Sequence, residues 1–374
     1  MFIKRNSEGA RPLTKCAIGI DEPFHGAVLN DRHGTRTDAG LEIDVTGSAH
    51  GAERVTVNGR PAELDGGRFA GRLVVSDRET DVCAEAHGPD GTCARTARVV
   101  WDRHSRPRYR FAIDDNSYFL RDIARVGYRS IFECAYLAFL RDIHARYGTH
   151  FTLNLFEERD DFTLAQLPDR YRGEWRDNAD WLRLTFHARA EFPDRPYQDA
   201  APGQLLADLD RVAEHIRRFA GEETYAPPGI IHWGMVRPSA YAALASRGVR
   251  VLSGYFVKAA SCGWDVNYLL DDARSRYLSR NEALKDFESG IIFSRIDLVV
   301  NTTPIDRIEP TLAAAASEGR TAEVMDVMTH EQYFWEHYPR FIPDHTDRVE
   351  TAVRWLTEHG YEPASLEDGY LLDA

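Results

Sequence analysis

Residues 108–115 read RYRFAIDD, a run that turns apolar and ends on two aspartates, and this stretch decides the fold class. It predicts a buried strand, and strand-like runs alternate with helix-like runs from here to the end of the chain. The strand-like runs are RYRFAIDD, HFTLNLF, WLRLTFH, GIIHW, RVLSGYF, RIDLVVN, AEVMDVMTH and YEPASLED. This alternation is typical of a parallel sheet, and about eight strands favour a closed barrel. We therefore expect an α/β domain with a (β/α) barrel over residues 104–374.

The part of the chain before this alternation has a different pattern. From about residue 20 to 102, short β-type runs are separated by the turn signals NG, DGG and PDG. The runs are LEIDVTG, RVTVNGR, RFAGRLVV, DVCAEA and TCARTARVVW. Their spacing predicts a small all-β, immunoglobulin-like sandwich over residues 1–103, with an accessory role. The polar segment DRHSRPRYR, which contains a proline, marks the predicted boundary.

Composition limits the partners that this chain can bind. Its 374 residues include 46 Lys and Arg against 59 Asp and Glu, and the formal charge of −13 disfavours nucleic acid and anionic bilayers. There is no run of about 18 apolar residues and no apolar secretory signal. We expect no membrane segment and a cytoplasmic location for the chain as written, or an extracellular one if it is a mature form. The oligomeric state is not indicated.

The cysteines give a weaker signal. Five cysteines without a CxxC pair predict neither a disulfide framework nor a structural zinc site. Cys83 and Cys93 could face each other across a hairpin, but free thiols in a reducing compartment are the preferred interpretation.

Chemically active side chains follow most of the strand-like runs. In a (β/α) barrel such groups lie at the C-terminal ends of the strands, because the loops there form the rim of the main concavity. Six of the eight runs end on acids, imidazoles or aromatic rings: Asp114-Asp115-Asn116, Glu157-Glu158, His187, His232-Trp233, Tyr255-Phe256 and His330-Glu331. We expect these side chains to surround one site.

A metal site is predicted from His187 and Glu191, which lie four residues apart in HARAE. Extended, the pair would be about 13 Å apart, whereas on a helical turn the Cβ atoms come within about 6 Å. With Asp115 as a third ligand and an open position for water, the set matches a catalytic zinc site, and mixed N and O ligands also admit other divalent metals. The alternative is an ordinary surface hydrogen bond on a helix.

Asp114 and Asp115 are expected to divide two tasks. Two adjacent carboxylates do not ionise alike, so one can bind metal while the other, Asp114, acts as a general base. The alternative is a helix cap, because DDNS precedes the helical-looking SYFLRDIAR. That alternative is preferred for Asn116 and Ser117.

Further residues are predicted to donate protons or to bind substrate. His330 closes an apolar run and can protonate a leaving group. The predicted substrate-binding residues are His232, Trp233, Tyr255, Glu331 and Trp335, and the aromatic ones could stack on sugar faces. The alternative for each imidazole and aromatic ring is an ordinary place in the core.

These motifs together resemble the polysaccharide deacetylase family, a distorted (β/α) barrel of metal-dependent amide hydrolases. Its usual TFDDG motif, in which the first Asp is the base and the second a metal ligand, falls on Asp114 and Asp115 in AIDDN. Its pair of histidines four residues apart falls on His187 and Glu191, and its closing LHD motif, with a general-acid histidine, falls on His330 in MTHEQ.

The resemblance covers about residues 108–374, and three positions depart from the family pattern. Glu191 replaces a histidine, Asn116 stands where glycine is usual, and GIIHWGMVRP has no clear match to the arginine-proline motif.

We therefore expect a metal-dependent hydrolase that removes acyl (acetyl) groups from a carbohydrate, with a divalent metal, zinc first. The rivals are a glycoside hydrolase with paired carboxylates such as Asp114 and Glu157, and a carbohydrate-binding protein without catalysis.

Overall fold

A computed structural model describes residues 16–259, 263–368 and 371, and the chain forms two compact units that divide between Trp101 and Asp102. Cys262 lies outside the described residues. Within them, no helix combines the length and the apolar character that crossing a membrane requires.

The first unit is built from β-strands. Apart from one short 3-10 turn, its regular elements are β1 (Ala17–Glu22), β2 (Val28–Leu29), β3 (Thr35–Thr37), β4 (Gly40–His50), β5 (Arg54–Val57), β6 (Arg60–Asp65), β7 (Arg68–Val75), β8 (Glu79–Gly88) and β9 (Gly91–Trp101). They hydrogen-bond along one path, β1-β4-β7-β6-β5-β8-β9-β2, with β3 beside β4. Because the strands are linked in one continuous hydrogen-bonded path, the structure does not divide them into two facing sheets. The immunoglobulin-like sandwich therefore stays a prediction.

One cysteine prediction is wrong in this unit. Cys16 and Cys93 form a disulfide, while Cys83 and the buried Cys134 of the second unit are free. Cys83 lies opposite Thr96 in the β8–β9 ladder, so it cannot face Cys93 across that hairpin. The sequence did not show that Cys16, just before β1, lies beside Cys93 of β9 in the folded unit.

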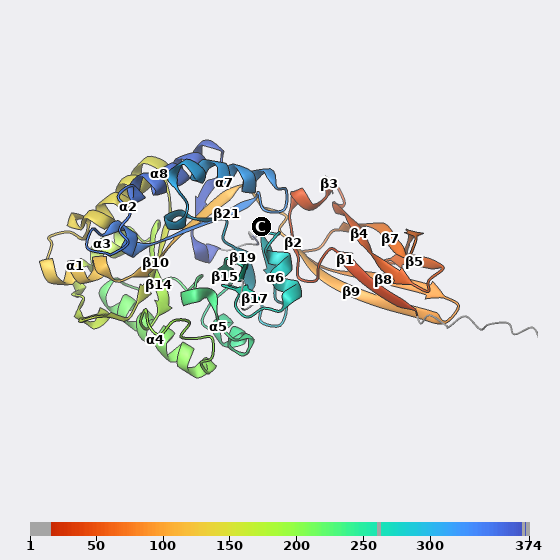
Figure 1. The fold of residues 1–374 in the computed structure, drawn as a ribbon, viewed down its shortest axis with the longest axis horizontal. Coiled ribbons are helices and arrows are strands. Elements are labelled where there is room, and N and C mark those ends of the chain that lie inside the picture. The colour runs from red at the N-terminus through yellow and green to blue at the C-terminus, as the bar shows by residue number, and fades with distance from the viewer. Residues whose placement is uncertain (1–15, 260–262, 369–370, 372–374) are drawn as a thin grey trace, which may run out of the picture. The chain divides into compact units, whose positions relative to one another are not determined.

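The second unit is a mixed α/β structure (Figure 1). Its main strands are β10 (Arg108–Asn116), β11 (Phe151–Phe156), β14 (Leu182–Ala188), β20 (Leu298–Val299), β21 (Val324–His330) and β22 (Glu362–Ala364). They form a parallel sheet in the order β14-β11-β10-β21-β20, and β22 pairs with the start of β10. Every residue of β10 and β11 is buried, as expected of a parallel sheet covered on both faces.

A second, three-stranded sheet consists of β15 (Val251–Gly254), β19 (Ile292–Arg295) and β18 (Ala283–Lys285). The closed barrel that the sequence predicts is not confirmed, because the described strands form separate sheets. The run GIIHW is not a strand, although the Gly229 carbonyl accepts a hydrogen bond from the Ser253 amide of β15. Pro227 and Pro228, just before it, lack the N–H groups that a ladder needs.

Helices and small hairpins complete this unit. The helices are α1 (Tyr118–Val126), α2 (Ala135–Tyr147), α3 (Arg172–Asp177), α4 (Pro202–Phe219), α5 (Tyr241–Ala245), α6 (Asp272–Leu278), α7 (Ile305–Ser317) and α8 (His345–Glu358). Two hairpins pair β12 (Glu158–Arg159) with β13 (Phe162–Thr163), and β16 (Val257–Ala259) with β17 (Gly263–Asp265). Helix α8 packs against α2 and α7, and α4 packs against β14 (Figure 1).

Candidate metal centre

The two aspartates lie at a backbone irregularity at the end of β10. The pairing of β10 with β11 shifts register between Ile113 and Asn116, so that Asp114 and Asp115 stand out of the ladder. Asp115 has a φ of 61°, in the left-handed region that few non-glycine residues adopt. This turn of the chain brings both carboxylates to the wall of one cavity, as the sequence predicts for a strand end.

His187 lies at a second irregularity, near the end of β14. Leu155 pairs with Phe186 and Phe156 pairs with Ala188, so the ladder passes over His187. Its Nδ1 is 3.2 Å from the carbonyl oxygen of Ile230. A carbonyl only accepts, so Nδ1 carries the proton and Nε2 keeps its lone pair.

His232 comes from the loop that replaces the expected fourth strand. It begins a short 3-10 turn, and its neighbour Trp233 has a φ of 63°. The Nε2 of His232 lies 3.2 Å from the carbonyl oxygen of Glu191. Nε2 is therefore the donor and Nδ1 keeps the lone pair.

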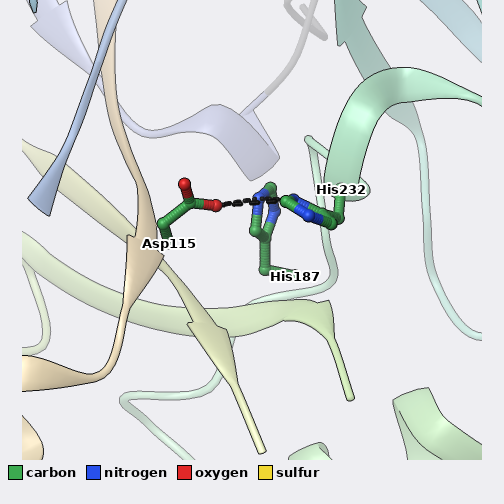
Figure 2. A group of neighbouring side chains, drawn as sticks. All are labelled: Asp115, His187 and His232. Atoms are coloured by element: carbon green, nitrogen blue, oxygen red, sulfur yellow. Dashed lines mark hydrogen bonds and ion pairs between the residues drawn. The ribbon is translucent and has the colours of Figure 1, made fainter. Parts of the chain in front are cut away.

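Three ligand atoms converge between these elements (Figure 2). Asp115 Oδ1 is 3.2 Å from His187 Nε2 and 3.4 Å from His232 Nδ1, and the two nitrogens are 3.0 Å apart. Oδ1 is buried and makes no hydrogen bond of ordinary geometry. Since the two backbone carbonyls fix both tautomers, three electron-rich atoms face one another without a proton between them.

The size of this triangle fits a bound cation. Ligand atoms about 2.0–2.1 Å from a tetrahedral metal lie roughly 3.3–3.4 Å from one another. The three measured separations fall at or slightly below that range. The carbonyl groups that hold both imidazoles are the outer partners that metal-binding histidines usually have.

The protonation states also suit metal binding. Burial lowers the pKa of His187 to about 4, so this imidazole is neutral near pH 7. Burial alone would raise the pKa of Asp115, but in the metal-free chain hydrogen bonds from protonated forms of His187 and His232, with the charge of His330, would hold it well below its usual range. A neutral imidazole and an ionised carboxylate are the forms that bind metals.

A second layer of side chains orients the aspartates. Gln332 Nε2 donates to Asp115 Oδ2 at 2.8 Å, which leaves Oδ1 turned toward the histidines. Asn154 Nδ2 donates to Asp114 Oδ1 at 2.6 Å, while Asp114 Oδ2 lies 3.8 Å from His187 Nε2. Burial and the charge of Asp115 raise the pKa of Asp114 well above its usual range. The pair therefore differs in protonation, as two adjacent carboxylates should.

His330, at the end of β21, lies beside this group. Its Nδ1 is 2.9 Å from Asn301 Oδ1, so the amide oxygen fixes Nδ1 as a donor and leaves Nε2 for proton exchange. Burial lowers its pKa, although the charge of Asp115 opposes that effect.

The two aspartates, the three histidines and Asn301 border a cavity of about 350 Å³, a volume typical of small-molecule sites. Of the predicted residues, it is lined by Asp114, Asp115, His187, His232, Trp233, Tyr255 and His330. The structure therefore brings together most of the predicted site.

Three predicted site residues are placed elsewhere. Glu191 is not on a helical turn, and its carboxylate pairs with Arg159 at 2.8 Å, so His232 replaces it in the ligand group. Glu331 is fully buried and accepts hydrogen bonds from three backbone N–H groups at the start of α1. Trp335 donates to Glu331 and does not line the cavity.

The position of Glu331 also corrects the expected cap of α1. Ser117 is the N-cap residue, but its side chain makes no capping bond, and Glu331 takes that role from a distant part of the chain. The Asn116 side chain instead donates to the carbonyl of Ile113 and accepts from the hydroxyl of Tyr136.

The sequence interpretation missed that His232 joins the candidate ligand group, and it missed the contacts of Gln332, Asn154 and Asn301. For His232 a signal was present, since GIIHW is an apolar run that ends on histidine, as the runs before His187 and His330 do. For the three amides the sequence gave no local signal.

Comparisons with known proteins add little to this geometry. No protein-family model matches the chain, and no curated protein matches it. Among solved structures, it is similar to a modular endo-β-1,4-mannanase of glycoside hydrolase family 26 from Cellulomonas fimi, with 20% identity, coverage of 24% of this chain and 19% of that one, and a TM-score of 0.18. It is also similar to a 4-α-glucanotransferase from Thermococcus litoralis, with 12% identity, coverage of 70% and 39%, and a TM-score of 0.45.

The matched region covers 19% of the mannanase and 39% of the glucanotransferase. At TM-scores below 0.5, neither likeness carries an argument about the fold or function of this chain. Neither of these two proteins is described as a deacetylase, so the resemblance to polysaccharide deacetylases is not confirmed by these comparisons.

Proposed function

We propose that this cavity is the active site of a metal-dependent hydrolase that removes an acyl group from a carbohydrate. The observation that carries the proposal is the convergence of Asp115 Oδ1, His187 Nε2 and His232 Nδ1, with both imidazole tautomers fixed by backbone carbonyls. Three protein ligands and an open position are typical of catalytic rather than structural metal sites.

Asp115, His187 and His232 would hold the divalent metal, with zinc as the first candidate because of its N and O ligand preference. When bound, such a metal polarises a carbonyl group and lowers the pKa of a water. The chain's own task is to keep the three ligand atoms in place, which Gln332 and the carbonyl groups of Ile230 and Glu191 do.

Asp114 is proposed as the general base. Its Oδ1 is occupied by the Asn154 amide, so Oδ2 accepts the proton of the attacking water. A cation beside the carboxyl group favours its ionised form and opposes the effect of burial. Asn154 fixes the carboxyl group in this orientation.

His330 is proposed as the general acid. Asn301 holds Nδ1, so Nε2 is the atom that passes a proton to the departing amine or alkoxide. Trp233 and Tyr255, both of which line the cavity and are partly exposed, offer faces on which a sugar ring can stack.

The first unit is proposed as an accessory module for attachment or glycan binding that supplies no catalytic group. In support, the three ligands, Asp114 and His330 all belong to the second unit.

A glycoside hydrolase is the second candidate. It is favoured by Asp114 and Asp115, whose pKa values are displaced in opposite directions, as those of an acid and its ionised partner are in such enzymes. The pair Asp114 and Glu157 is not assembled, because Glu157 lies outside the cavity and contacts Arg211. Cleavage of this kind would not require the metal.

The deciding experiment combines metal analysis with two product assays. Protein purified without added metal is analysed for divalent metals, then incubated with acylated amino sugars while released acid and new reducing ends are measured. The proposal requires bound metal and acid release, and chelation must abolish that release. Reducing ends without acid would support the glycoside hydrolase, and neither product over a broad panel would support a binding protein.

A further inference from the structure

We infer that the deep part of the cavity binds the acyl chain of the substrate and is built for a chain longer than acetyl. This inference rests on the proposed function and adds the class of acyl group that the site accepts. Hydrolysis adds water across the acyl C–N or C–O bond and yields a carboxylic acid and the free amine or hydroxyl of the sugar. No bond within the acyl chain is made or broken, so the length of the acyl chain affects turnover only through binding.

The first argument is the apolar wall of the cavity. Ile230, Ile296 and Met328 line the cavity and are 5%, 4% and 6% exposed. They belong to a buried apolar cluster, and the partly buried Val299 packs against it and also lines the cavity. An acetyl group has one methyl to place against a wall, whereas this wall presents four side chains.

The second argument is that the hydroxyl groups along this wall are already bonded to the protein. Ser253 Oγ donates to Asp326 Oδ2 at 3.0 Å, and Thr302 Oγ1 donates to the carbonyl of Val299 at 3.1 Å. Because both hydroxyl protons are already donated, a sugar ring placed here would find no donor in these two groups and would leave some of its own acceptors unpaired, which is unfavourable. An alkyl chain would lose nothing, so it is the better occupant.

The third argument is the division of the cavity into two kinds of surface. Trp233 and Tyr255 are 37% and 42% exposed, so the aromatic faces that suit a sugar are accessible to solvent. Ile296 and Met328 belong to the buried core and suit an apolar group. An acyl sugar has the same two parts on either side of its scissile bond.

The fourth argument is a second, smaller cavity behind the apolar wall. Ile230, Ser253, Ile296 and Met328 line both cavities, and the second has a volume of about 10 Å³, room for roughly one water-sized group. Met328 is flexible and can move to admit a longer chain. Arg110 and Asp326, a buried ion pair, line the far cavity and set a limit to the depth that an apolar chain can reach.

The experiment uses the full metal-loaded chain and glucosamine N-acylated with acetyl, butyryl or hexanoyl groups. Free amine is measured, so that one assay serves all three. We expect kcat/KM to rise roughly three- to fourfold for each added methylene, the ratio that corresponds to burying one such group. Val299→Phe, which fills the cavity, should remove this rise.

Two further variants complete the design. Met328→Ala enlarges the pocket and should increase the preference for hexanoyl over acetyl. This variant keeps the inference testable if the Val299→Phe protein does not fold. Val126→Phe introduces the same change on α1, where Val126 is 57% exposed and outside the cavity, and should match the wild type.

The outcomes separate the inference from the proposed function. Turnover of all three substrates at equal kcat/KM, or a Val299→Phe protein with unchanged chain-length dependence, overturns the inference and leaves the hydrolase. If no amine is released, the proposed function fails, and calorimetry with acetate, butyrate and hexanoate decides the pocket. If the affinity for these acids rises with chain length and Val299→Phe removes that rise, the inference of an acyl-chain pocket is supported. Equal affinities for the three acids overturn it.

Discussion

The sharpest test of the metal centre compares His232→Ala with Glu191→Ala. The structure places His232 in the group that could hold a metal and pairs the Glu191 carboxylate with Arg159, whereas the spacing of HARAE predicts Glu191 as the ligand. Alanine at position 191 keeps the backbone carbonyl that holds His232 Nε2. The two substitutions should therefore have very different effects.

For His232→Ala, we expect metal affinity to fall by more than the roughly 10–100-fold that follows loss of an outer partner. Glu191→Ala removes one nearby negative charge, and its effect should stay below about tenfold. In the wild type, free metal at 1,000 times Kd should add about 4 kcal/mol to the free energy of unfolding. That stabilisation corresponds to a rise in Tm of roughly 8–16 °C for a unit of this size.

Isothermal titration calorimetry with zinc and thermal unfolding with and without zinc measure both quantities. Glu191→Ala should keep most of the Tm rise and His232→Ala should lose it. If His232→Ala binds zinc as the wild type does, or if Glu191→Ala loses binding, the ligand set derived from the structure is wrong.

Four further predictions follow from the same structure. Asp114→Asn should lower turnover at least about a hundredfold and leave metal content unchanged, as elemental analysis and kinetics will show. Glu331→Ala leaves backbone N–H groups of α1 without their acceptor and should cost at least about 2 kcal/mol in urea unfolding, with KM unchanged. Because the folded protein lowers the pKa of His187 from 6.5 to about 4, chelated protein should lose up to about 3 kcal/mol as pH falls through that window, and His187→Gln should lack this loss. Reducing the disulfide between Cys16 and Cys93, which are 77 residues apart, should destabilise the first unit by about 4 kcal/mol without changing metal affinity.

The sequence predicts the strand that carries the aspartates because that signal is local. RYRFAIDD contains both the buried strand and the carboxylates at its end, and the structure places Asp114 and Asp115 beside one cavity. His187 and His330 are predicted from the same kind of pattern. Each of these residues needs only its own strand to reach the site.

Other features depend on parts of the chain that meet only after folding. The lone pair that His232 turns toward Asp115 and His187 depends on the carbonyl of Glu191, 41 residues earlier, which fixes the tautomer. Glu331 is adjacent to His330, but neighbouring residues at a strand end point to opposite sides, which takes Glu331 into the core and to the start of α1. The periodicity of the sequence does not show which residues far apart along the chain come into contact.

The closed barrel illustrates the same limit on a larger scale. Counting strand-like runs gives about eight, but the run around His232 is a loop. Strand β18 and most of β19 come from the stretch between the runs RVLSGYF and RIDLVVN, where no strand was expected. Pro227, Pro228 and Gly229 indicate that a strand is interrupted here. How many ladder hydrogen bonds are lost depends on the neighbouring strands, which the local sequence does not show.

The left-handed backbone of Asp115 restricts how this site can change during evolution. With a φ of 61°, the position favours Asp, Asn or Gly, and β-branched residues are strongly disfavoured there. A lineage that loses this carboxylate could therefore keep the fold most easily through Asn or Gly. In related sequences, Asn or Gly at this position would indicate that this strand end is retained without the carboxylate, whereas valine or isoleucine would indicate that the turn itself has been rebuilt.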